Sequence, residues 1–386
     1  MTKICFITTV SLTLDAFVLD LANYIHSITN WDITFVCNND EVFAKKLPNY
    51  IHYHPIEMKR GISIGGINAI FKMKHFFKEQ QFDIIQYSTP NASLYASIAG
   101  KSARIPVRLY CQWGMAYVGF SGFKRRVFKI IEKVVCGNST WIEPDSFSNL
   151  RFAHQEGLYP DSIGSVIGKG SACGVNLNKF DISSKQKYKK SIRDKYQIPD
   201  NAFVFGFVGR ITRDKGINEL LFASKLLFDK HPNAWLLIVG HAEKDKNVDN
   251  DLYDWAQKNK RIIFTGFTSV VEQYISAMDC FVLPSYREGF GMSVVESEAM
   301  GIPVVVTDIP GPIDGMIKDK TGLIVQKKDA LSLVRAMEKM LMSPNLCEEF
   351  SKNGVRFATE NFEQTELFRQ IYEDRLRLID ESRWMN

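Results

Sequence analysis

The sequence predicts an α/β protein of two domains, each built on a parallel sheet that helices cover on both faces. At 386 residues the chain is too long for one comfortable core, so two domains of ordinary size are expected. Short runs rich in β-branched and aromatic residues alternate with longer segments of helical period, which is typical of βαβ units. A lysine-rich run at 181–201 has no hydrophobic period before Ile198, and it predicts the domain junction at its front edge.

The expected strands alternate with helical segments in chain order. In the first domain, residues 1–180, the strand-like runs are KICFITT, DITFVC, FDIIQYS and VRLYCQW. In the second domain, residues 181–361, they are FVFGFVGR, AWLLIVG, RIIFTG, CFVLPS and PVVVTD. The last segment, 362–386, has apolar residues at helical spacing, which predicts a helix that packs on another part of the chain. Those residues are Leu367, Phe368, Ile371, Tyr372, Leu376 and Ile379.

The composition is that of an ordinary soluble globular protein. Hydrophobic residues make up 45% and charged residues 24%, and no apolar stretch reaches the length of a membrane-spanning helix. The first ten residues start a strand rather than a secretory signal, so a cytoplasmic location is expected. The seven cysteines stand singly, which argues against a zinc site and a disulfide framework. The formal charge of +5 is too small for a nucleic-acid-binding surface, but it is compatible with smaller anionic partners.

Two cations follow the first strand of the second domain, where a parallel sheet binds its ligands. The loop RITRDKG comes directly after FVFGFVG and contains Arg210 and Lys215. Their positive charges suit a phosphate group. The alternative is a pair of solvated loop charges, since a short motif of this kind also occurs by chance.

A second loop combines a glycine turn with two carboxylates. The strand CFVLPS leads into the turn YREGFGM and then into the helix SVVESEAM, with Glu288 before the turn and Glu296 inside the helix. Unpaired N–H groups at a helix start beside open glycines favour anions. Two alternatives remain open: Ser293 and Glu296 fit a capping box, and Glu288 fits an exposed turn residue. Because both loops end strands of one sheet, they predict a diphosphate pocket with a carboxylate on either side.

These motifs resemble a known enzyme family. VGRITRDKG, a GF pair after a strand, SYREGFGMSVVESEAMGIPVVVTDIPG and DKTGLIV are similar, in this order, to the retaining nucleotide-sugar glycosyltransferases of family four. The two glutamates form the family's E-x7-E element. In the first domain, IGKGSACGVNLNKFD and IEKVVCGNSTWIEPDSFSNL also resemble this family. The resemblance implies the GT-B fold of two facing Rossmann-like domains, with the last helix crossing back to the first.

The resemblance also implies a donor site in the second domain. Arg210 and Lys215 would hold the diphosphate, while Glu296 would bind the ribose and Glu288 the transferred sugar. The turn near Phe267 would face the base. The remaining donor-binding positions are Gly209, Gly289, Phe290, Gly291, Met292 and Ser293. Family members retain the anomeric configuration, and the implied front-face reaction needs no metal ion and no cofactor, because cations and a helix dipole stabilise the leaving diphosphate.

The implied substrates are a UDP-sugar, or another nucleotide sugar, and a polyprenyl-diphosphate-linked saccharide acceptor used in bacterial capsule, O-antigen or other surface-polysaccharide synthesis. Two features depart from the family pattern. The first loop, TTVSLTLD, lacks a glycine pair, and Trp113 with Gly114 stands where relatives often have His-Gly. Two interpretations of Trp113 stay open: it lines the acceptor site, or it packs in the core.

Other function classes fit the sequence less well. A Rossmann dehydrogenase needs G-x-G-x-x-G after its first strand, and the first loop has no glycine. The sequence DND at 249–251 has the spelling of a metal-binding motif, but it lies in a polar stretch that is typical of a loop and helix start. The harder alternative is a GT-B-fold nucleotide-sugar epimerase, and a sugar- or lipid-binding module is a distant third. Release of nucleotide diphosphate with a lengthened acceptor would distinguish a transferase from an epimerase.

Two basic, aromatic-bearing segments predict docking on the anionic inner leaflet of the cell membrane. In the first, 123–135, one helix face is expected to be apolar and the other basic; in the second, 58–78, exposed aromatics are expected among lysines. The alternative is that each apolar face packs on the first-domain sheet. Docking would bring the enzyme to a lipid-linked acceptor. The residues concerned are Phe123, Val127, Ile130, Ile131 and Val134, with Arg125, Arg126, Lys129 and Lys133, and then Lys59, Arg60, Lys72, Lys74 and Lys78 with Phe76 and Phe77.

Overall fold

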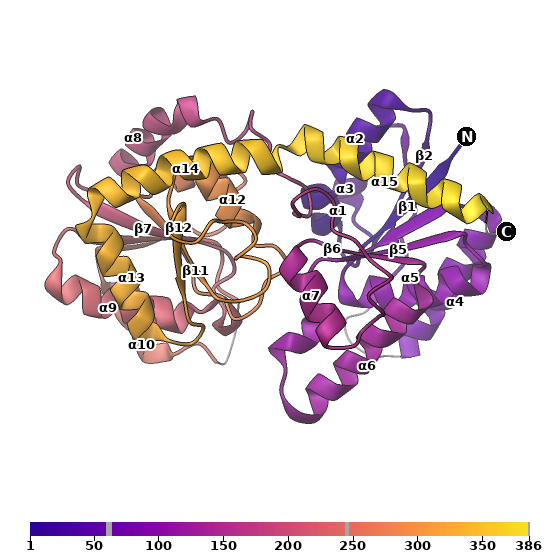
Figure 1. Cartoon of the computed structure of the whole chain (residues 1–386), viewed down its shortest axis with the longest axis horizontal. Coiled ribbons are helices and arrows are strands. Elements are labelled where there is room, and N and C mark those ends of the chain that lie inside the picture. Colours follow the sequence, from indigo (N-terminus) through magenta and orange to yellow (C-terminus); the bar gives the residue numbers. More distant parts are fainter. Residues whose placement is uncertain (59–63, 244–246, 385–386) are drawn as a thin grey trace. The chain divides into compact units, whose positions relative to one another are not determined.

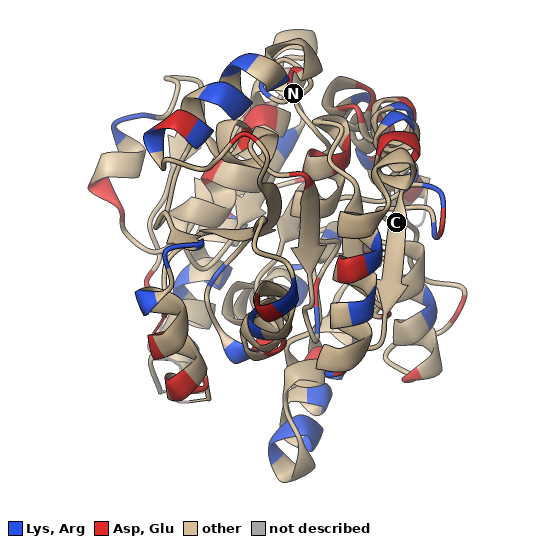
Figure 2. Ribbon diagram, turned by 90° about the vertical axis from the view of Figure 1, so that its left-hand side faces the viewer, with Lys and Arg blue, Asp and Glu red and all other residues tan. Residues whose placement is uncertain are grey.

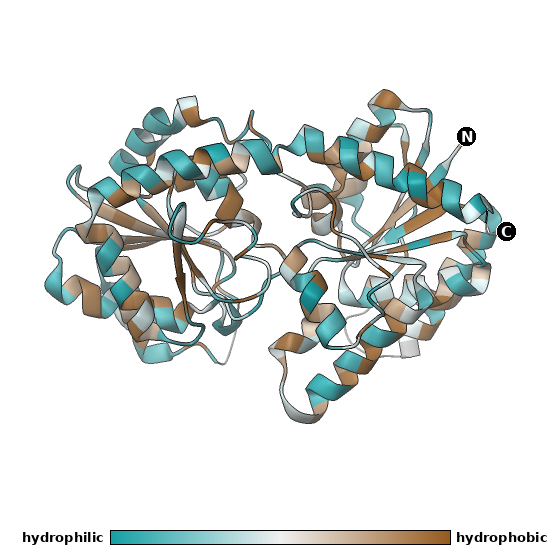
Figure 3. Cartoon of the chain, viewed as in Figure 1, coloured by the Kyte–Doolittle hydropathy of each residue, from teal (hydrophilic) through white to brown (hydrophobic). Residues whose placement is uncertain are grey.

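A computed structural model describes residues 1–58, 64–243 and 247–384. The chain divides into two compact units, each an α/β domain with a six-stranded parallel sheet (Figure 1). The first unit contains Met1–Gly174 and Thr365–Asn386, and the second contains Val175–Gln364. Charged residues lie mainly on helices and loops (Figure 2), whereas hydrophobic residues are concentrated in the strands (Figure 3). The predicted fold class is therefore confirmed.

The sheet of the first unit has the strand order β3-β2-β1-β4-β5-β6, with parallel neighbours throughout. Its strands are β1 (Lys3–Ile7), β2 (Asp32–Val36), β3 (Ile51–Tyr53), β4 (Ile84–Tyr87), β5 (Val107–Gln112) and β6 (Trp141–Pro144). Its helices are α1 (Ser11–Phe17), α2 (Leu19–Ile28), α3 (Glu41–Ala44), α4 (Ile64–Gln80), α5 (Pro90–Ala103), α6 (Gly122–Asn138), α7 (Phe147–Gln155) and α15 (Gln364–Trp384).

The sheet of the second unit has the corresponding order β12-β11-β10-β7-β8-β9. Its strands are β7 (Phe203–Val208), β8 (Ala234–Val239), β9 (Ile262–Phe264), β10 (Cys280–Leu283), β11 (Val304–Thr307) and β12 (Gly322–Val325). Its helices are α8 (Lys185–Lys195), α9 (Ile217–Lys230), α10 (Asn250–Lys258), α11 (Val271–Ser276), α12 (Met292–Ala299), α13 (Ala330–Met342) and α14 (Pro344–Phe362). From β7 to β9 the chain adds strands toward one edge of the sheet, and from β10 to β12 it adds them toward the other edge. The loops after β7 and β10 therefore border the switch point, where such folds bind ligands.

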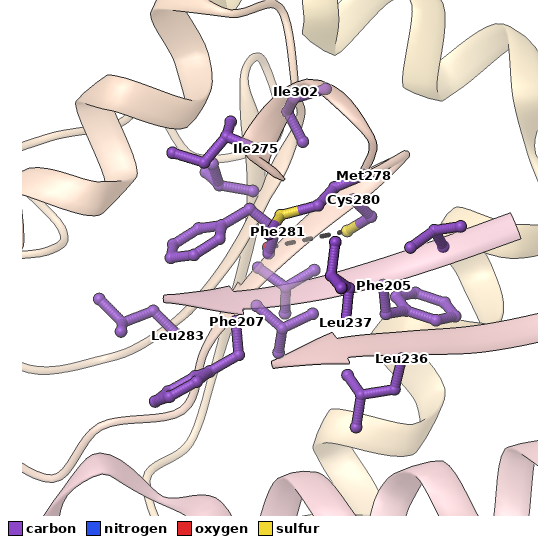
Figure 4. Close-up of a cluster of buried hydrophobic side chains, with 14 of the residues drawn as sticks. Phe205, Phe207, Leu236, Leu237, Ile275, Met278, Cys280, Phe281, Leu283 and Ile302 are labelled. Atoms are coloured by element: carbon purple, nitrogen blue, oxygen red, sulfur yellow. Dashed lines mark hydrogen bonds between the residues drawn. The ribbon is translucent and has the colours of Figure 1, made fainter. Parts of the chain in front are cut away.

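All nine predicted strands are present, but β3, β6 and β12 were not among the nine predicted runs. These three are edge strands of three or four residues: β3 (IHY) and β6 (WIEP) contain polar residues, and β12 (GLIV) is bounded by polar and charged residues. The core of the second unit packs side chains from β7, β8 and β10 against residues around α11 (Figure 4). Phe205, Phe281 and Met278 lie among them and are fully buried.

The division between the units falls at 174/175 and 364/365, not at the predicted 180/181 and 361/362. The reason is a short parallel pairing inside the second unit. The amide of Val175 donates to the carbonyl of Phe362 at 2.7 Å, and the amide of Gln364 donates to the carbonyl of Val175 at 3.1 Å. Both Val175 and Phe362 are buried in the second core, so the residues on either side of the junction belong to that unit.

The helix α15 packs on the first unit through its apolar face. Leu367, Phe368, Ile371 and Ile379 are buried in a core cluster with residues of α2, β1 and β2, and Tyr372 and Leu376 pack against it half-buried. The predicted spacing of these residues is therefore reproduced in a helix that begins at Gln364.

A buried arginine fixes α15 across the sheet. The Arg375 guanidinium donates to Gln86 Oε1 of β4 at 3.0 Å and to Glu143 Oε1 of β6 at 2.9 Å, and it also bonds the second Glu143 oxygen. Asp374 lies 3.0 Å from it. Burial opposes the charge of Arg375, but Glu143 outweighs that effect and holds the pKa of the guanidinium above its ordinary value. The helix is thus bound to the centre of the sheet by charge-assisted hydrogen bonds as well as by apolar contact.

The first prediction concerns this ion pair. Arg375→Ala leaves Glu143 buried without its main partner, so the free energy of unfolding should fall by about 3–5 kcal/mol. The matched control is Arg377→Ala, because Arg377 is partly exposed and pairs with Asp374 and Glu381 on the same helix. That control should cost at most about 1 kcal/mol. Urea unfolding with hydrogen exchange over α15 measures both variants, and equal small losses would contradict the anchoring role of Arg375.

Candidate functional site

The loops that follow β7 and β10 touch each other at the carboxyl edge of the second sheet. β7 and β10 are neighbouring parallel strands, so their ends lie side by side. The amide of Tyr286 donates to the carbonyl of Asp214 at 2.8 Å. Gly216 has φ +72°, and a Cβ there would lie 2.0 Å from the Pro284 carbonyl oxygen. Only glycine permits this approach, which places Lys215 against the second loop.

Lys215 and Glu288 form the central ion pair of the site. The Lys215 ammonium lies 2.6 Å from Glu288 Oε1 and 2.8 Å from Oε2. The Ser285 hydroxyl donates to Glu288 Oε1 at 2.7 Å. Only 19% of the Lys215 side chain and 10% of the Glu288 side chain are exposed. Glu288 is therefore not the exposed turn residue of the alternative interpretation.

Arg210 lies at the outer side of the same loops. Its guanidinium pairs with Glu243 at 2.9 Å and lies 3.9 Å from Asp214. Asp214 also pairs with Arg287 at 2.8 Å and accepts from the Thr212 hydroxyl at 2.6 Å. Burial acts to raise the pKa of Asp214, but the Thr212 hydroxyl and the neighbouring cations outweigh it and lower that pKa. The pairing of Asp214 with Arg287 was not predicted, although both residues lie directly beside Lys215 and Glu288 in the motifs.

The glycine turn leads directly into α12. The helix begins at Met292, and Gly291 is its N-cap residue with φ +86°. Ser293 is therefore the second residue of the helix, and the capping-box interpretation of Ser293 and Glu296 is wrong. Phe290 is buried against Phe362, at 5.3 Å between ring centroids, so only its backbone is available to a ligand.

A second close approach shapes this turn. Gly311, in the loop after β11, has φ +101°, and a Cβ there would lie 1.8 Å from the carbonyl oxygen of Gly289. The three loops after β7, β10 and β11 are thus packed together through backbone contacts. The turn at Gly289 and the start of α12 share one site with the cations, which suits an anionic ligand.

Glu296 belongs to a separate charged cluster. Its side chain is half-buried, and burial raises its pKa to about 7, with Lys179 acting to lower it and Glu272 to raise it further. The Lys179 ammonium lies 4.0 Å from Glu272 Oε2, and Glu272 is buried at the start of α11. Neither Lys179 nor Glu272 was predicted, because no sequence motif links them to Glu296.

Gly209 and Phe267 mark the outer loops of the site. Gly209 follows β7, and its amide donates to the Val239 carbonyl at 2.9 Å. Phe267 follows β9 and is 69% exposed, so its ring is accessible to a planar group. The predicted site residues thus fall into the pair Lys215–Glu288, the glycine turn, the cluster around Glu296, and the outer residues Arg210, Gly209 and Phe267.

In the first unit, Trp113 and Gly114 follow β5. Trp113 is half-buried and packs against Phe17, with 5.5 Å between ring centroids. It therefore contacts the core of the first unit and also keeps part of its surface exposed. Asp249 of the DND sequence caps α10 by accepting from the Leu252 amide at 3.0 Å. Among the residues that the structure describes, no three His, Cys, Asp or Glu side chains come together as metal ligands would.

The predicted faces of α6 are partly wrong. Phe123, Ile130 and Val134 are exposed, but Arg126 and Lys133 share that exposed face instead of lying opposite. Arg125 and Lys129 bind Glu156 at 3.1 and 2.8 Å. Val127 and Ile131 are half-buried. The helix turns its smaller apolar group, Phe128, Val135 and Cys136, toward the core. Basic bands and hydrophobic bands are both visible along α6, at the foot of Figures 2 and 3.

The aromatics expected to be exposed in the second basic segment are buried. Phe76 and Phe77 pack with Phe82 in the core of the first unit, because they lie on the inner face of α4. Two other residues of α4, Ile67 and Phe71, are exposed instead. Lys72 and Lys78 are exposed and Lys74 is half-exposed, while Lys59 and Arg60 lie outside the described residues.

Comparison with known proteins identifies the family. Residues 188–357 match the family described as Glycosyl transferases group 1, and residues 3–144 match the one described as Glycosyl transferase 4-like. The capsular polysaccharide biosynthesis glycosyltransferase CapM of Staphylococcus aureus is 30% identical over 346 residues, which is 89% of each chain. An α-1,3-galactosyltransferase of Escherichia coli, named for UDP-Gal and α-D-GlcNAc-diphosphoundecaprenol, is 25% identical over 349 residues, or 84% of this chain and 85% of that protein.

Solved structures agree on the fold. HepE of Anabaena, in complex with UDP, has a TM-score of 0.78 at 18% identity and covers 97% of this chain and 99% of its own. Sucrose-phosphate synthase of Thermosynechococcus elongatus has a TM-score of 0.78 at 19% identity over 99% and 100% of the two chains. These relatives do not favour the epimerase alternative. The chain belongs to the group 1 glycosyltransferases, the family-four type with the GT-B fold that its motifs predicted.

Proposed function

We propose that this glycosyltransferase moves a sugar from a UDP-sugar to a polyprenyl-diphosphate-linked saccharide, with retention of anomeric configuration, in bacterial surface-polysaccharide synthesis. The observation that carries the proposal is the Lys215–Glu288 pair beside the glycine turn and the start of α12. The names of CapM and of the galactosyltransferase support the polysaccharide role and the lipid-linked acceptor. The UDP bound to HepE supports the choice of nucleotide.

The cations would stabilise the leaving diphosphate. An ammonium has three hydrogen-bond donors, and Lys215 directs two contacts at Glu288, so a phosphate oxygen can be its third partner. Arg210 would exchange Glu243 for a second phosphate oxygen, because both of those side chains are more than two-fifths exposed. Negative charge that develops on the diphosphate as the glycosidic bond breaks would meet these groups and the amino end of α12.

Glu288 would position the sugar. Lys215 and Ser285 hold both of its oxygens, so the carboxylate has a fixed orientation and can accept a hydrogen bond from a sugar hydroxyl. The acceptor hydroxyl would attack from the face that the diphosphate leaves, and the departing phosphate oxygen would take its proton. That geometry retains the anomeric configuration without a protein nucleophile.

Glu296 would bind the ribose. With its pKa near 7, the carboxyl is partly protonated at neutral pH, and two ribose hydroxyls would stabilise its ionised form. Lys179 works in the same direction, because its charge lowers the pKa of Glu296. The exposed ring of Phe267 would stack on the base.

The exposed face of α6 would dock on an anionic membrane. Phe123, Ile130 and Val134 present apolar surface next to Arg126 and Lys133 on one side of the helix. Within the described part of the chain, none of the helices combines the length and the apolarity needed to cross a bilayer. An interfacial helix of this kind inserts its apolar residues while its cations bind lipid headgroups. Peripheral attachment to the inner leaflet would place the enzyme at its lipid-linked acceptor.

The second prediction separates the two glutamates. Glu296→Ala should weaken binding of both UDP and the UDP-sugar by about 1.5–3 kcal/mol, because it removes a charged acceptor. Glu288→Gln should leave UDP affinity unchanged or raise it, because Lys215 loses its carboxylate partner, while the rate of transfer falls. Calorimetric titration with UDP and initial-rate measurements test both variants. The assignment fails if the two variants lose the same UDP affinity.

The wild-type enzyme supplies a control for Glu296. Its affinity for the UDP-sugar, whose diphosphate does not titrate in this range, should decrease as the pH falls through about 7, because protonation removes acceptor capacity from the Glu296 carboxyl. Glu296→Ala should abolish this pH dependence. An unchanged pH profile in the variant would remove Glu296 from the nucleotide site.

The third prediction is that transfer needs no divalent cation. Arg210, Lys215 and the amino end of α12 already supply positive charge to the diphosphate. EDTA should therefore leave the rate of transfer within about twofold of its untreated value. Losing about 1 kcal/mol of transition-state stabilisation would lower the rate by more than that. The measurement is release of UDP in the presence of acceptor, with and without chelator. Loss of activity in EDTA that Mg²⁺ or Mn²⁺ restores would contradict the proposed role of these residues.

The fourth prediction tests membrane docking. The protein should sediment with anionic liposomes at low salt and be released at high salt, because headgroup attraction is screened. Arg126→Gln with Lys133→Gln should weaken binding by about 2 kcal/mol, or roughly 30-fold. Phe123→Ser with Ile130→Ser should also weaken it, whereas Leu331→Ser, an equally apolar exposed position on α13, should not. Equal, negligible binding to anionic and neutral liposomes would favour a soluble acceptor.

A further inference from the structure

The second unit contains a cavity at the edge of the sheet opposite to the donor loops. Its volume is about 380 Å³, within the range of small-molecule sites. Its walls include Phe203 at the start of β7, Asp279 directly before β10 and Pro303 directly before β11. Because the strands are parallel, these amino ends are separated from the Lys215–Glu288 site by the full length of the strands.

Three cations of α8 line this cavity. Lys185, Lys189 and Arg193 follow one another at intervals of four residues, which puts them on one face of the helix. Figure 2 shows the basic bands of α8 at its upper left. The Lys185 ammonium donates to the Gly301 carbonyl at 2.6 Å, and Lys189 pairs with Asp279 at 2.7 Å. Lys185 and Lys189 thus line the cavity, and the structure records one protein partner for each ammonium group.

The third cation is fixed in place. Arg193 is 5% exposed and bonds the carbonyls of Ala202 and Ala277 as well as Asp279, at 2.6 Å from that carboxylate. Asp279 also accepts from the Val204 amide at 2.8 Å. The position of Arg193, and with it the face of α8, is therefore set by the main chain directly before β7 and at the end of α11.

The interior of the cavity has an excess of positive charge. Three carboxylates line it, but Asp200 and Glu348 are exposed at the rim, and Glu348 pairs with Lys352 at 2.6 Å. Asp279 is left as the inner carboxylate against Lys185, Lys189 and Arg193. Burial, and after it the charge of Lys189, lower the pKa of Lys185 to about 8, while Asp279 acts to raise it.

The start of α14 adds to this potential. Pro344, the first residue of this 19-residue helix, lines the cavity together with Cys347. One side of the first two turns of α14 therefore borders the same space as the lysines, with the positive end of the helix dipole nearby. Three cations against one inner carboxylate leave an excess of two charges, which matches a ligand of charge −2.

We propose that this cavity binds a phosphate dianion, either inorganic phosphate or the phosphate group of a small monoester, between Lys185 and Lys189. The ligand would accept hydrogen bonds from both ammonium groups and would stabilise the protonated state of Lys185. The site is independent of the proposed sugar transfer, because none of its residues lies in the donor loops.

The experiment follows the reactivity of Lys185 in the full-length protein. N-hydroxysuccinimidyl acetate, an uncharged reagent, acetylates unprotonated lysines, and peptide mass spectrometry gives the rate at each site. At constant ionic strength, phosphate at about ten times its own dissociation constant should slow acetylation of Lys185 roughly tenfold, because only the unoccupied fraction of the protein reacts. Acetylation of Lys339, an exposed lysine on α13, should not change and serves as the internal control. Because the readout is local to Lys185, phosphate bound at Arg210 or Lys215 does not affect it.

Two variants and two anions decide the outcome. Lys189→Gln should abolish the protection of Lys185, whereas Lys189→Arg, which keeps the charge and the pairing with Asp279, should preserve it. Inorganic phosphate and glycerol phosphate are compared, and protection by the ester alone would identify a monoester as the ligand. The proposal is overturned if neither anion slows acetylation of Lys185 more than acetylation of Lys339. It is also overturned if phosphate still protects Lys185 in the Lys189→Gln variant.

Discussion

The contact between Lys215 and Glu288 is the interaction on which the donor site depends. Burying an ion pair costs desolvation free energy that the attraction between the charges does not always recover, so such a pair is weak evidence of a stabilising role. Here each partner comes from a loop at the end of a different strand, β7 or β10. The pair exists because these strands are neighbours and because Gly216 lets the loops approach to backbone contact. The fold and the glycine are thus conditions for the chemistry.

The α/β class and the core strands could be predicted from sequence because their signal is local. A buried parallel strand is a short apolar run, and nine such runs were recognisable. The edge strands β3, β6 and β12 lack that signal, because polar residues interrupt their short apolar runs or lie directly beside them. The position of the unit boundary depends on hydrogen bonds between Val175 and residues near Phe362, which are far apart in sequence.

The error on α6 has a specific physical cause. The helix carries two apolar groups on different sides, and the larger one, with Phe123, Ile130 and Val134, was expected to oppose a basic face. The core instead takes Phe128, Val135 and Cys136, together with Glu132. That buried carboxylate is tolerated because the Tyr110 hydroxyl and the Gln112 amide donate to it at 2.9 and 2.6 Å. Periodicity shows that a helix is amphipathic, but it does not show which of two apolar sides meets the sheet.

The candidate site shows the same limit. Lys215, Glu288 and the glycine turn are contiguous motifs, so sequence reasoning found them. The partners of Glu296 come from elsewhere: Glu272 from α11 and Lys179 from the segment that follows Val175. The chain passes from one unit to the other at 174/175 and again at 364/365. Backbone hydrogen bonds join these two segments, from Val175 to Phe362 and from Gln364 to Val175. Lys179 lies only four residues beyond the first passage. The charge that lowers the pKa of Glu296 is therefore carried by the segment where the chain enters the second unit, whereas the Lys215–Glu288 pair is built from the strand ends alone.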